Sequence, residues 1–488
     1  MKLVVVMQHA NFFRNLETVV RELDARGHET VMLYGDHPSD PKTGARAQRK
    51  KPKMAFMGRG IEVAEAEIPS LTTGFRPVPD EPRQRRLRTG RQVVNRGLYL
   101  RKDHPSPERV VEGLEKQMHP RARKWMESRA VRAVLARSGT LRAWRRIERS
   151  GRPSEAVTAL LRQLEPDVVL VSPTVWPKLP VEADYLHAAR KLGIPTVGYL
   201  NSWDNLTSKG TVHVLPDVFI VWNEALAIEA EQIHLIPREI IRVTGAPHLD
   251  HFFEMRPSLP RAETTGAMGC PDDGPYIVYL CSSRTLIADE TPIVTALADA
   301  LARELGAGAP TIVVRPHPVN AEPWNGYEHP GTAVYPKGGD QADTPESWQE
   351  YFDQLSGASA FVGLNTTAFL EAAAADRPCL TIVSDEFFDQ QGRTGHFRHL
   401  LDADFLEVSK DADGVAARLA RVLDGADEKA QGRRRFAESF LRPQGIETSA
   451  RSVVTDTIEA LAGVGPGAHL TPVADRTAVP AMAAKEEA

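Results

Sequence analysis

Short apolar runs and longer amphipathic stretches alternate along most of the chain. The apolar runs have the length and content of buried strands, and we expect strands at residues 3–7, 29–34, 167–171, 196–200, 218–222, 241–244, 276–280, 311–314, 333–335, 360–364, 379–383 and 407–409, with another within 58–69. Apolar residues three and four positions apart predict helices at residues 12–26, 181–192, 348–355, 415–423, 433–441 and 447–461. Because strands that alternate with helices pair in parallel, the pattern predicts an α/β fold.

The alternation occurs in two blocks. The chain has 488 residues, which is too long for one compact core and favours two domains. We expect a Rossmann-like domain over residues 1–256, a linker over 257–274 and a second Rossmann-like domain over 275–464. A basic helical insertion at about 83–150 interrupts the first domain, and residues 465–488, rich in Ala, Pro and Thr, are predicted to be disordered.

Residues 358–391 carry the most informative functional pattern. A predicted strand ends at Asn365, Thr366 and Thr367, and an Ala-rich helix with Glu371 in its first turn follows. Ligands of parallel sheets bind beyond the carboxyl ends of the strands. We therefore expect the three polar residues and the helix N-terminus to bind an anion. Glu371 is expected to accept two hydroxyl groups, as from a ribose.

Two further strand ends in the second half carry cationic or polar side chains. Arg284 follows the strand at 276–280 among small residues, which suits a phosphate contact. Arg315 and His317 alternate with Pro316 and Pro318, and the prolines fix the turn so that both side chains are held towards the cleft. A histidine placed there for backbone reasons alone is the alternative.

Two side chains in the first half are candidate general bases. Asp204 lies in the polar 201–210 loop after a strand, together with Lys209 as a candidate phosphate contact. An Asx-turn at Asp204 is the structural alternative. His9 lies in the loop that leaves the first strand, where a histidine with only local hydrogen bonds is equally expected.

These features resemble the GT-B glycosyltransferases, whose donor-binding half carries small polar residues, Glu-Ala, a short helix and x-Pro. The resemblance implies that Glu371 binds the nucleotide ribose and that the adjacent helix N-terminus binds the diphosphate. It also implies that Asp389 and Gln390 hold hydroxyl groups of the donor sugar. The Arg-Pro-His-Pro turn at 315–318 is similar to that of capsule and teichoic-acid transferases and of UDP-N-acetylglucosamine 2-epimerases.

The resemblance implies displacement at a sugar anomeric carbon, with a nucleoside diphosphate leaving. Helix dipoles and cationic side chains would stabilise the diphosphate, and Asp204 or His9 would deprotonate the acceptor. No cofactor beyond the nucleotide-sugar co-substrate is expected, and no residue spacing indicates a metal site. Gly363 stands eight positions before Glu371, where many retaining members carry an acid, so we expect inversion.

Other activities fit the same pattern. A nucleotide-sugar 2-epimerase and a polyol-phosphate transferase of the CDP-glycerol type are the catalytic alternatives. A sugar-nucleotide or membrane-surface binding module without turnover is the alternative of another class. The sequence leaves the acceptor open between a glycan, a lipid-linked molecule and a small molecule, in glycan or surface-polysaccharide synthesis.

Charge is concentrated in the insertion. The whole chain carries a formal net charge of −4, yet residues 83–149 are rich in arginine, with Tyr99, Trp125 and Trp144 interleaved. Such helices suit an anionic membrane surface, and a solvated helical face is the alternative. Nucleic acid is not expected, because no stacking motif or recognition helix is identifiable.

The compartment is predicted from cysteine usage and from the apolar runs. Three cysteines without metal spacing indicate reduced core residues. The sequence shows no signal peptide and no apolar run near the roughly 20 residues of a membrane-spanning helix. We therefore expect a cytoplasmic protein, with peripheral attachment to the inner face of the membrane as a further possibility.

Overall fold

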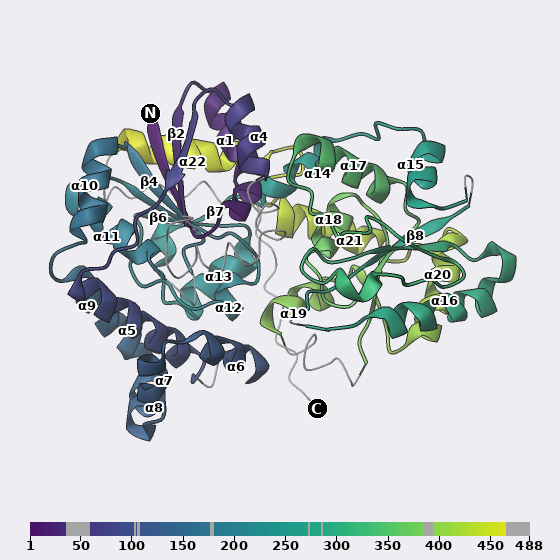
Figure 1. The fold of residues 1–488 in the computed structure, drawn as a ribbon, viewed down its shortest axis with the longest axis horizontal. Coiled ribbons are helices and arrows are strands. Elements are labelled where there is room, and N and C mark those ends of the chain that lie inside the picture. The colour runs from purple at the N-terminus through teal and green to yellow at the C-terminus, as the bar shows by residue number, and fades with distance from the viewer. Residues whose placement is uncertain are drawn as a thin grey trace.

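The computed structural model describes residues 1–35, 59–101, 104, 108–175, 180–271, 274–284, 286–384 and 394–464. The described chain forms two lobes, each built on one parallel sheet (Figure 1). The first sheet has the order β3-β2-β1-β4-β5-β6-β7 and the second β10-β9-β8-β11-β12-β13. The strands are β1 Lys2–Met7, β2 Glu29–Tyr34, β3 Leu71–Phe75, β4 Val168–Ser172, β5 Thr196–Tyr199, β6 Val218–Val221, β7 Ile241–Val243, β8 Tyr276–Leu280, β9 Thr311–Arg315, β10 Thr332–Val334, β11 Phe361–Gly363, β12 Cys379–Ile382 and β13 Leu406–Ser409. The predicted α/β architecture of two Rossmann-like domains is confirmed.

Helices cover both faces of each sheet. Those before the second sheet are η1 Ala10–Asn15, α1 Glu17–Ala25, α4 Arg59–Glu67, α5 Pro82–Leu98, α6 Glu108–Gln117, α7 Pro120–Met126, α8 Arg129–Leu135, α9 Ser138–Arg149, α10 Glu155–Leu164, α11 Glu182–Leu192, α12 Asn205–Ser208, α13 Glu224–Gln232, η2 Arg238–Ile240, η3 Pro247–Leu249, α14 Asp250–Glu254 and α15 Arg261–Met268. The later ones are α16 Thr291–Leu305, η4 Gly306–Gly308, η5 Glu322–Trp324, α17 Pro345–Ser356, α18 Ala368–Ala374, α19 Gly395–Asp402, α20 Ala412–Leu423, α21 Ala430–Phe436, the π-helical η6 Ala437–Leu441 and α22 Ala450–Val464.

The strands are buried on both faces, which explains their almost continuous apolar runs. In β1, Leu3 and Val5 face the core under α1, α4 and α22, whereas Val4 and Val6 face the core under α10 and α11. In the second sheet, α16 and α20 cover one face. The core on its other face extends into the first lobe and includes Trp203. The two lobes are therefore joined by packed side chains.

One predicted element was wrong, and one predicted connection contains a helix. Residues 58–69 were expected to add a strand, but Arg59–Glu67 form α4 and the strand follows as β3. Ile61, Ala64 and Ile68 are the buried residues there, at helical rather than alternating spacing. The expected linker at 257–274 contains α15, which buries Thr264, Thr265 and Met268. Because α15 is short and buries few residues, its sequence pattern does not predict a helix.

The insertion forms helices α5 to α9, which lie below the first lobe in Figure 1. Several of its arginines are buried and hold it to that lobe. Arg91 donates to Glu148 in α9 and to Asp184 in α11. Arg145 donates to the carbonyl oxygens of Val212, His234 and Leu235. Arg91 and Arg145 therefore stabilise the insertion and do not face solvent or a membrane surface.

The aromatic residues of the insertion are also divided between core and surface. Tyr99 is buried, and Trp144 donates from Nε1 to His213 Nδ1 at 3.0 Å. A Cβ atom at Gly90 would lie 2.3 Å from the Trp144 ring, so α5 and α9 meet closely only because position 90 is glycine. Trp125 alone of the three aromatic residues singled out in the sequence is exposed.

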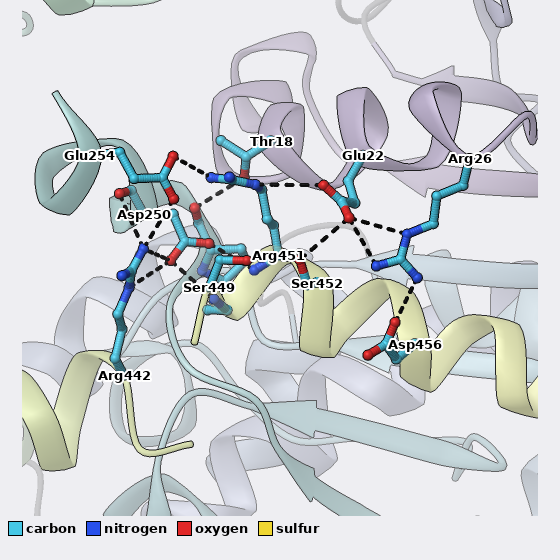
Figure 2. A network of polar contacts seen from close by, with 12 residues as sticks. Thr18, Glu22, Arg26, Asp250, Glu254, Arg442, Ser449, Arg451, Ser452 and Asp456 are labelled. Atoms are coloured by element: carbon cyan, nitrogen blue, oxygen red, sulfur yellow. Dashed lines mark hydrogen bonds and ion pairs between the residues drawn. The ribbon is translucent and has the colours of Figure 1, made fainter. Parts of the chain in front are cut away.

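The chain crosses between the lobes twice. It leaves the first lobe after α14 and returns between η6 and α22, which packs against α1 (Figure 1). Val454, Ile458 and Leu461 of α22 join the core under the first sheet. The expectation that the last helix crosses back is met. Polar contacts around Asp250 hold this return (Figure 2).

Candidate functional site

A cavity of about 810 Å³ lies between the two lobes. It is lined by residues that follow the carboxyl ends of strands in both sheets, as parallel sheets predict. The second lobe contributes Cys281, Ser283, Arg284, Arg315, Pro316, His317, Pro318, Tyr351, Asn365, Thr366, Thr367, Glu371, Thr394 and His396. The first lobe contributes Arg14, Glu112, Lys116, Trp203, Asp204, Ser208 and Lys209. The structure thus brings together all the predicted second-lobe residues that it describes.

Glu371 on α18 is oriented by its neighbours. Its Oε2 accepts a hydrogen bond from the Tyr351 hydroxyl on α17. The guanidinium of Arg315 lies over the Tyr351 ring, 4.0 Å from its centroid. Arg315 Nη1 also donates to Gln354 Oε1 at 2.8 Å. The carboxylate and the cation are therefore held by α17, an element in which no functional residue was predicted.

Arg14 belongs to the first lobe, and its side chain lies near Glu371 and Tyr351 of the second lobe. It lies in η1, directly after β1, and lines the cavity. Burial lowers the pKa of Arg14, and the charges of Glu371 and Asp343 oppose that change. Since an arginine keeps its charge throughout the physiological range, the second lobe receives a half-buried cation from the first. Arg14 was not predicted from the sequence, where its only signal is its place seven residues beyond the first strand.

His317 is neutral near pH 7. Burial, with the charge of Arg14, lowers its pKa to about 4. Its Nδ1 accepts from the backbone N–H of Val319 at 3.2 Å. The proton of the neutral ring is therefore on Nε2. His317 can donate one hydrogen bond to a ligand but does not add positive charge, which changes the electrostatic role expected from the sequence.

Arg284 is an exposed cation of the site. Its side chain is 65% exposed, and its Nη1 lies 3.7 Å from Glu322 Oε2, itself an exposed carboxylate. Exposed pairs of this kind are weak, so Arg284 can turn towards a ligand at little cost.

The polar turn before α18 is partly occupied by protein contacts. Thr366 Oγ1 accepts from the N–H of Ala368 at 3.3 Å. Thr367 Oγ1 accepts from Trp203 Nε1 of the other lobe at 3.2 Å. Asn365 is buried at the cavity wall. Trp203 of the polar 201–210 loop is buried, and its ring packs edge-on against the His396 ring with centroids 5.0 Å apart.

Asp204 lines the cavity from the first lobe. Its Oδ2 accepts from the Ser208 hydroxyl at 2.8 Å and lies 3.2 Å from Lys209 Nζ. Burial alone would raise the pKa of Asp204, but Lys209, His396 and the serine hydrogen bonds lower it far below the usual range. The carboxylate is ionised and can accept a proton, though it is a weak base while Lys209 remains beside it.

The remaining predicted residues lie elsewhere. His9 packs against Phe12, with ring centroids 5.7 Å apart, and is not among the described residues that line the cavity. Asp389 and Gln390 lie outside the described residues. Besides Arg14, Tyr351 was not predicted from the sequence, and neither was the place of Glu112 and Lys116 of α6 in the cavity wall. Within the described chain, no group of three His, Cys, Asp or Glu side chains could hold a metal ion.

No protein-family model matches the sequence, and a search of curated proteins finds no match. Solved structures are similar over nearly the whole chain. UDP-GlcNAc 2-epimerase from Neisseria meningitidis, bound to UDP-GlcNAc, aligns with a TM-score of 0.52 and 12% identity over 94% of this chain and 100% of that chain. UDP-GlcNAc 2-epimerase from Methanocaldococcus jannaschii aligns with a TM-score of 0.51 and 12% identity over 94% and 99%. A glycosyltransferase from Rickettsia africae aligns with a TM-score of 0.50 and 9% identity over 94% and 98%. These similarities establish the fold, and the chain has the two-domain GT-B fold.

Proposed function

We propose that the protein is a glycosyltransferase that uses a nucleotide-diphosphate sugar as donor. The observation that carries the proposal is the cavity between the lobes. In it, the oriented Glu371 carboxylate lies near the cation Arg14, and Arg284 and Arg315 line the same cavity. A carboxylate suits a ribose and the cations suit a diphosphate. Similarity to a UDP-GlcNAc 2-epimerase bound to UDP-GlcNAc supports the same donor class.

In the proposed reaction, an acceptor hydroxyl oxygen bonds to the anomeric carbon while the bond from that carbon to the diphosphate oxygen breaks. Arg14, Arg284 and Arg315 would stabilise the charge that develops on the leaving diphosphate, and His317 would donate from Nε2. The proton of the acceptor hydroxyl would pass to Asp204, which lines the cavity, rather than to His9. Asp389 and Gln390 remain the predicted sugar contacts.

Two features support transfer with inversion and without a covalent intermediate. A Cβ atom at Gly363 would lie 2.9 Å from the carbonyl oxygen of Leu280, so a carboxylate side chain does not fit at the position used by many retaining relatives of this fold. The cavity volume, about 810 Å³, falls in the upper part of the roughly 300–1,000 Å³ range of ligand pockets. It leaves room for an acceptor beside the donor.

A nucleotide-sugar 2-epimerase is the second candidate, because the similar structures include 2-epimerases. An epimerase acts on the nucleotide sugar alone and needs carboxylates around the sugar ring. Glu112, Asp204, Asp340 and Glu371 line the cavity. Because Glu371 is assigned to the ribose, three carboxylates remain for a sugar ring, and the room for an acceptor beside the donor favours transfer.

Product analysis separates the candidates. Thermal-shift titrations with UDP, GDP, CDP and dTDP first identify the base of the donor. The protein is then incubated with the matching nucleotide sugars, with and without a mixture of candidate acceptors. Acceptor-dependent release of nucleoside diphosphate supports the proposal. An epimer formed without acceptor supports the second candidate, release of CMP from a CDP-polyol indicates the polyol-phosphate transferase, and a bound but unchanged donor indicates a binding module.

A further inference from the structure

The outer face of α7 and α8 is cationic and also exposes large apolar side chains. We call it the α7–α8 surface and define it by Arg121, Lys124, Trp125, Arg129, Arg132 and Val134, all of which are exposed. Trp125 is 56% exposed and Val134 is 52% exposed. In Figure 1, α7 and α8 project away from the first lobe, with α8 at the outer end.

The cations of this surface are not used to hold the fold. Arg91 and Arg145, elsewhere in the insertion, are buried and satisfied by carboxylates or carbonyl oxygens. In contrast, α8 buries no residue completely, and α7 buries only Ala122 and Met126. The insertion therefore contains one set of arginines that stabilise it and a second set that faces solvent.

The local charge is strongly positive. Residues 120–135, which span α7 and α8, contain five Lys or Arg and one Glu, while the whole chain carries −4. An anionic partner is the electrostatic complement of such a face.

The apolar side chains decide between anionic partners. Tryptophan prefers the membrane interface, where its ring is apolar on one side and hydrated on the other. Lys and Arg beside it can lay their aliphatic stems on the same boundary. A single-stranded nucleic acid would require several aromatic side chains for stacking, and Trp125 is the one large exposed aromatic of the described α7–α8 surface. Among the helices in the described part of the chain, none has the length and apolar content needed to cross a membrane.

The surface is connected to the cavity through the insertion itself. Lys116 and Glu112 of α6 line the cavity, and only Met118 and His119 separate α6 from α7. An ion pair at 2.6 Å between Arg96 of α5 and Glu115 fixes α6. A membrane bound at the α7–α8 surface would thus lie next to an element that forms one wall of the cavity.

We propose that the α7–α8 surface binds an anionic membrane and brings the cavity to acceptors held in that membrane. Membrane binding does not depend on the proposed function. The choice of a lipid-linked acceptor rests on that function, and it selects one of the three acceptor classes that the sequence leaves open.

Vesicle co-sedimentation tests the proposal. The protein should sediment with phosphatidylcholine vesicles that contain phosphatidylserine and stay in solution with pure phosphatidylcholine. Binding should weaken from 0.1 M to 0.5 M salt, because the screening length shortens. Each cation near an anionic surface contributes roughly fivefold to partitioning. Reversing Arg121, Lys124, Arg129 and Arg132 to Glu should therefore reduce binding at least about a hundredfold.

Two further variants separate charge from apolar contact. Trp125→Ala should weaken binding to anionic vesicles severalfold, while four charge reversals at the exposed residues Arg162, Lys191, Arg398 and Lys410 should have a smaller effect. Nucleotide thermal shifts should be unchanged in every variant, so failure of membrane binding is distinguishable from failure of the proposed function. Equal sedimentation with both vesicle types, equal loss in both quadruple variants, binding only to an oligonucleotide, or self-association through this face would overturn the proposal.

Discussion

At the scale of single residues, the cavity combines a hydrogen-bond acceptor that its neighbours hold in place with cationic side chains that differ in how freely they can move. Glu371 is oriented by Tyr351, and Tyr351 is covered by Arg315. Arg284 is exposed and weakly paired. Preorganised groups bind with less loss of conformational freedom than mobile ones. We therefore assign recognition of the nucleotide to the Glu371 group, and adjustment to the diphosphate to Arg284.

Glu371→Gln should weaken nucleotide binding by an order of magnitude or more. The substitution keeps the shape of the side chain but removes charge-assisted hydrogen bonds, which contribute about 1.5–3 kcal/mol each. Calorimetric titration with UDP, GDP, CDP and dTDP measures the loss. Glu350→Gln is the matched control, because Glu350 also accepts from a tyrosine hydroxyl but does not line the cavity. Unchanged affinity in a folded Glu371→Gln protein would remove the ribose role.

Asp204→Asn should lower turnover by about 10²–10⁴-fold and leave donor affinity within a few fold, because the amide cannot take the acceptor proton. Single-turnover measurements with excess enzyme give the chemical rate. A structural role in the turn before α12 predicts a lower melting temperature instead, so both are recorded. If Asp204→Asn stays active and His9→Ala does not, the base is His9.

The sequence could predict the residues that follow strands, because carboxyl ends of parallel strands converge at one edge. Arg284, Arg315 and His317 all lie at the cavity for this reason. It could not predict Tyr351 or Arg14. Their side chains reach the site through the packing of helices on the sheet and of one lobe on the other, and no local pattern encodes that approach.

At the scale of elements, the insertion is anchored by a fully satisfied arginine. Arg91 donates to both oxygens of Glu148, both oxygens of Asp184 and the carbonyl of Pro180. These hydrogen bonds join α5, α9 and α11. A spacing signal was present in the sequence: Leu87, Arg91 and Leu98 fall on one helical face, and all three are buried. Charge alone made Arg91 look like a surface residue.

Arg91→Ala should destabilise the protein by about 3–5 kcal/mol, because it leaves the buried carboxylates of Glu148 and Asp184 without a cation. Urea unfolding gives the change in free energy. Arg86→Ala, on the exposed face of the same helix, is the control and should change stability by no more than about 0.5 kcal/mol. Similar effects of the two substitutions would contradict the buried network.

The turn after β8, which carries Arg284, is held by Glu290. The Oε1 of Glu290 accepts from the N–H of Ser282 at 2.6 Å, and Oε2 accepts from the Tyr279 hydroxyl at 2.8 Å. Burial raises the pKa of Glu290 to about 7. Because the folded protein holds this proton more tightly than the unfolded chain, the contribution to stability is fully present below about pH 4.5. It is lost as the pH rises through 7.

In the wild type, the free energy of unfolding should fall as the pH rises from about 4.5 to 7.5. This fall should be smaller in Glu290→Gln. The contribution removed is on the order of 3 kcal/mol across that window. Urea unfolding of both proteins at several pH values measures the difference in slope. Glu304→Gln, on the exposed side of α16, controls for removal of a carboxylate. Parallel curves for the wild type and Glu290→Gln would show that Glu290 does not take up the proton.

At the scale of the whole molecule, the two segments that connect the lobes are hydrogen-bonded to each other and to the first lobe. Asp250, at the outgoing crossing, accepts from Arg442 Nε on the returning segment at 3.0 Å (Figure 2). It also accepts from the backbone N–H groups of Ala450 and Arg451 at 3.0 and 2.7 Å, and so caps α22. Gly245 allows this contact, since a Cβ atom there would lie 2.7 Å from Ala450 Cβ and Leu441 O.

A second set of contacts in the same figure is more exposed. Arg26 of α1 pairs with Asp456 of α22 at 2.6 Å, and Arg451 pairs with Glu254 at 2.9 Å (Figure 2). Exposed pairs contribute about 0–1 kcal/mol each, whereas Asp250 and Arg442 are both buried. The free energy that keeps α22 on the first lobe is therefore concentrated in its apolar face and in Asp250.

Asp250→Asn should loosen the start of α22. The amide nitrogen would face an N–H donor in either orientation, and the buried charge of Arg442 would keep only the exposed carboxylate of Glu254, which costs up to about 3–5 kcal/mol. We expect faster amide hydrogen exchange in the first turns of α22, and a calorimetric unfolding that separates into two transitions as the lobes lose their connection. Asp456→Asn, at the exposed end of the same network, should leave both measurements nearly unchanged. A single transition at the wild-type temperature in Asp250→Asn would mean that apolar packing of α22 alone joins the lobes.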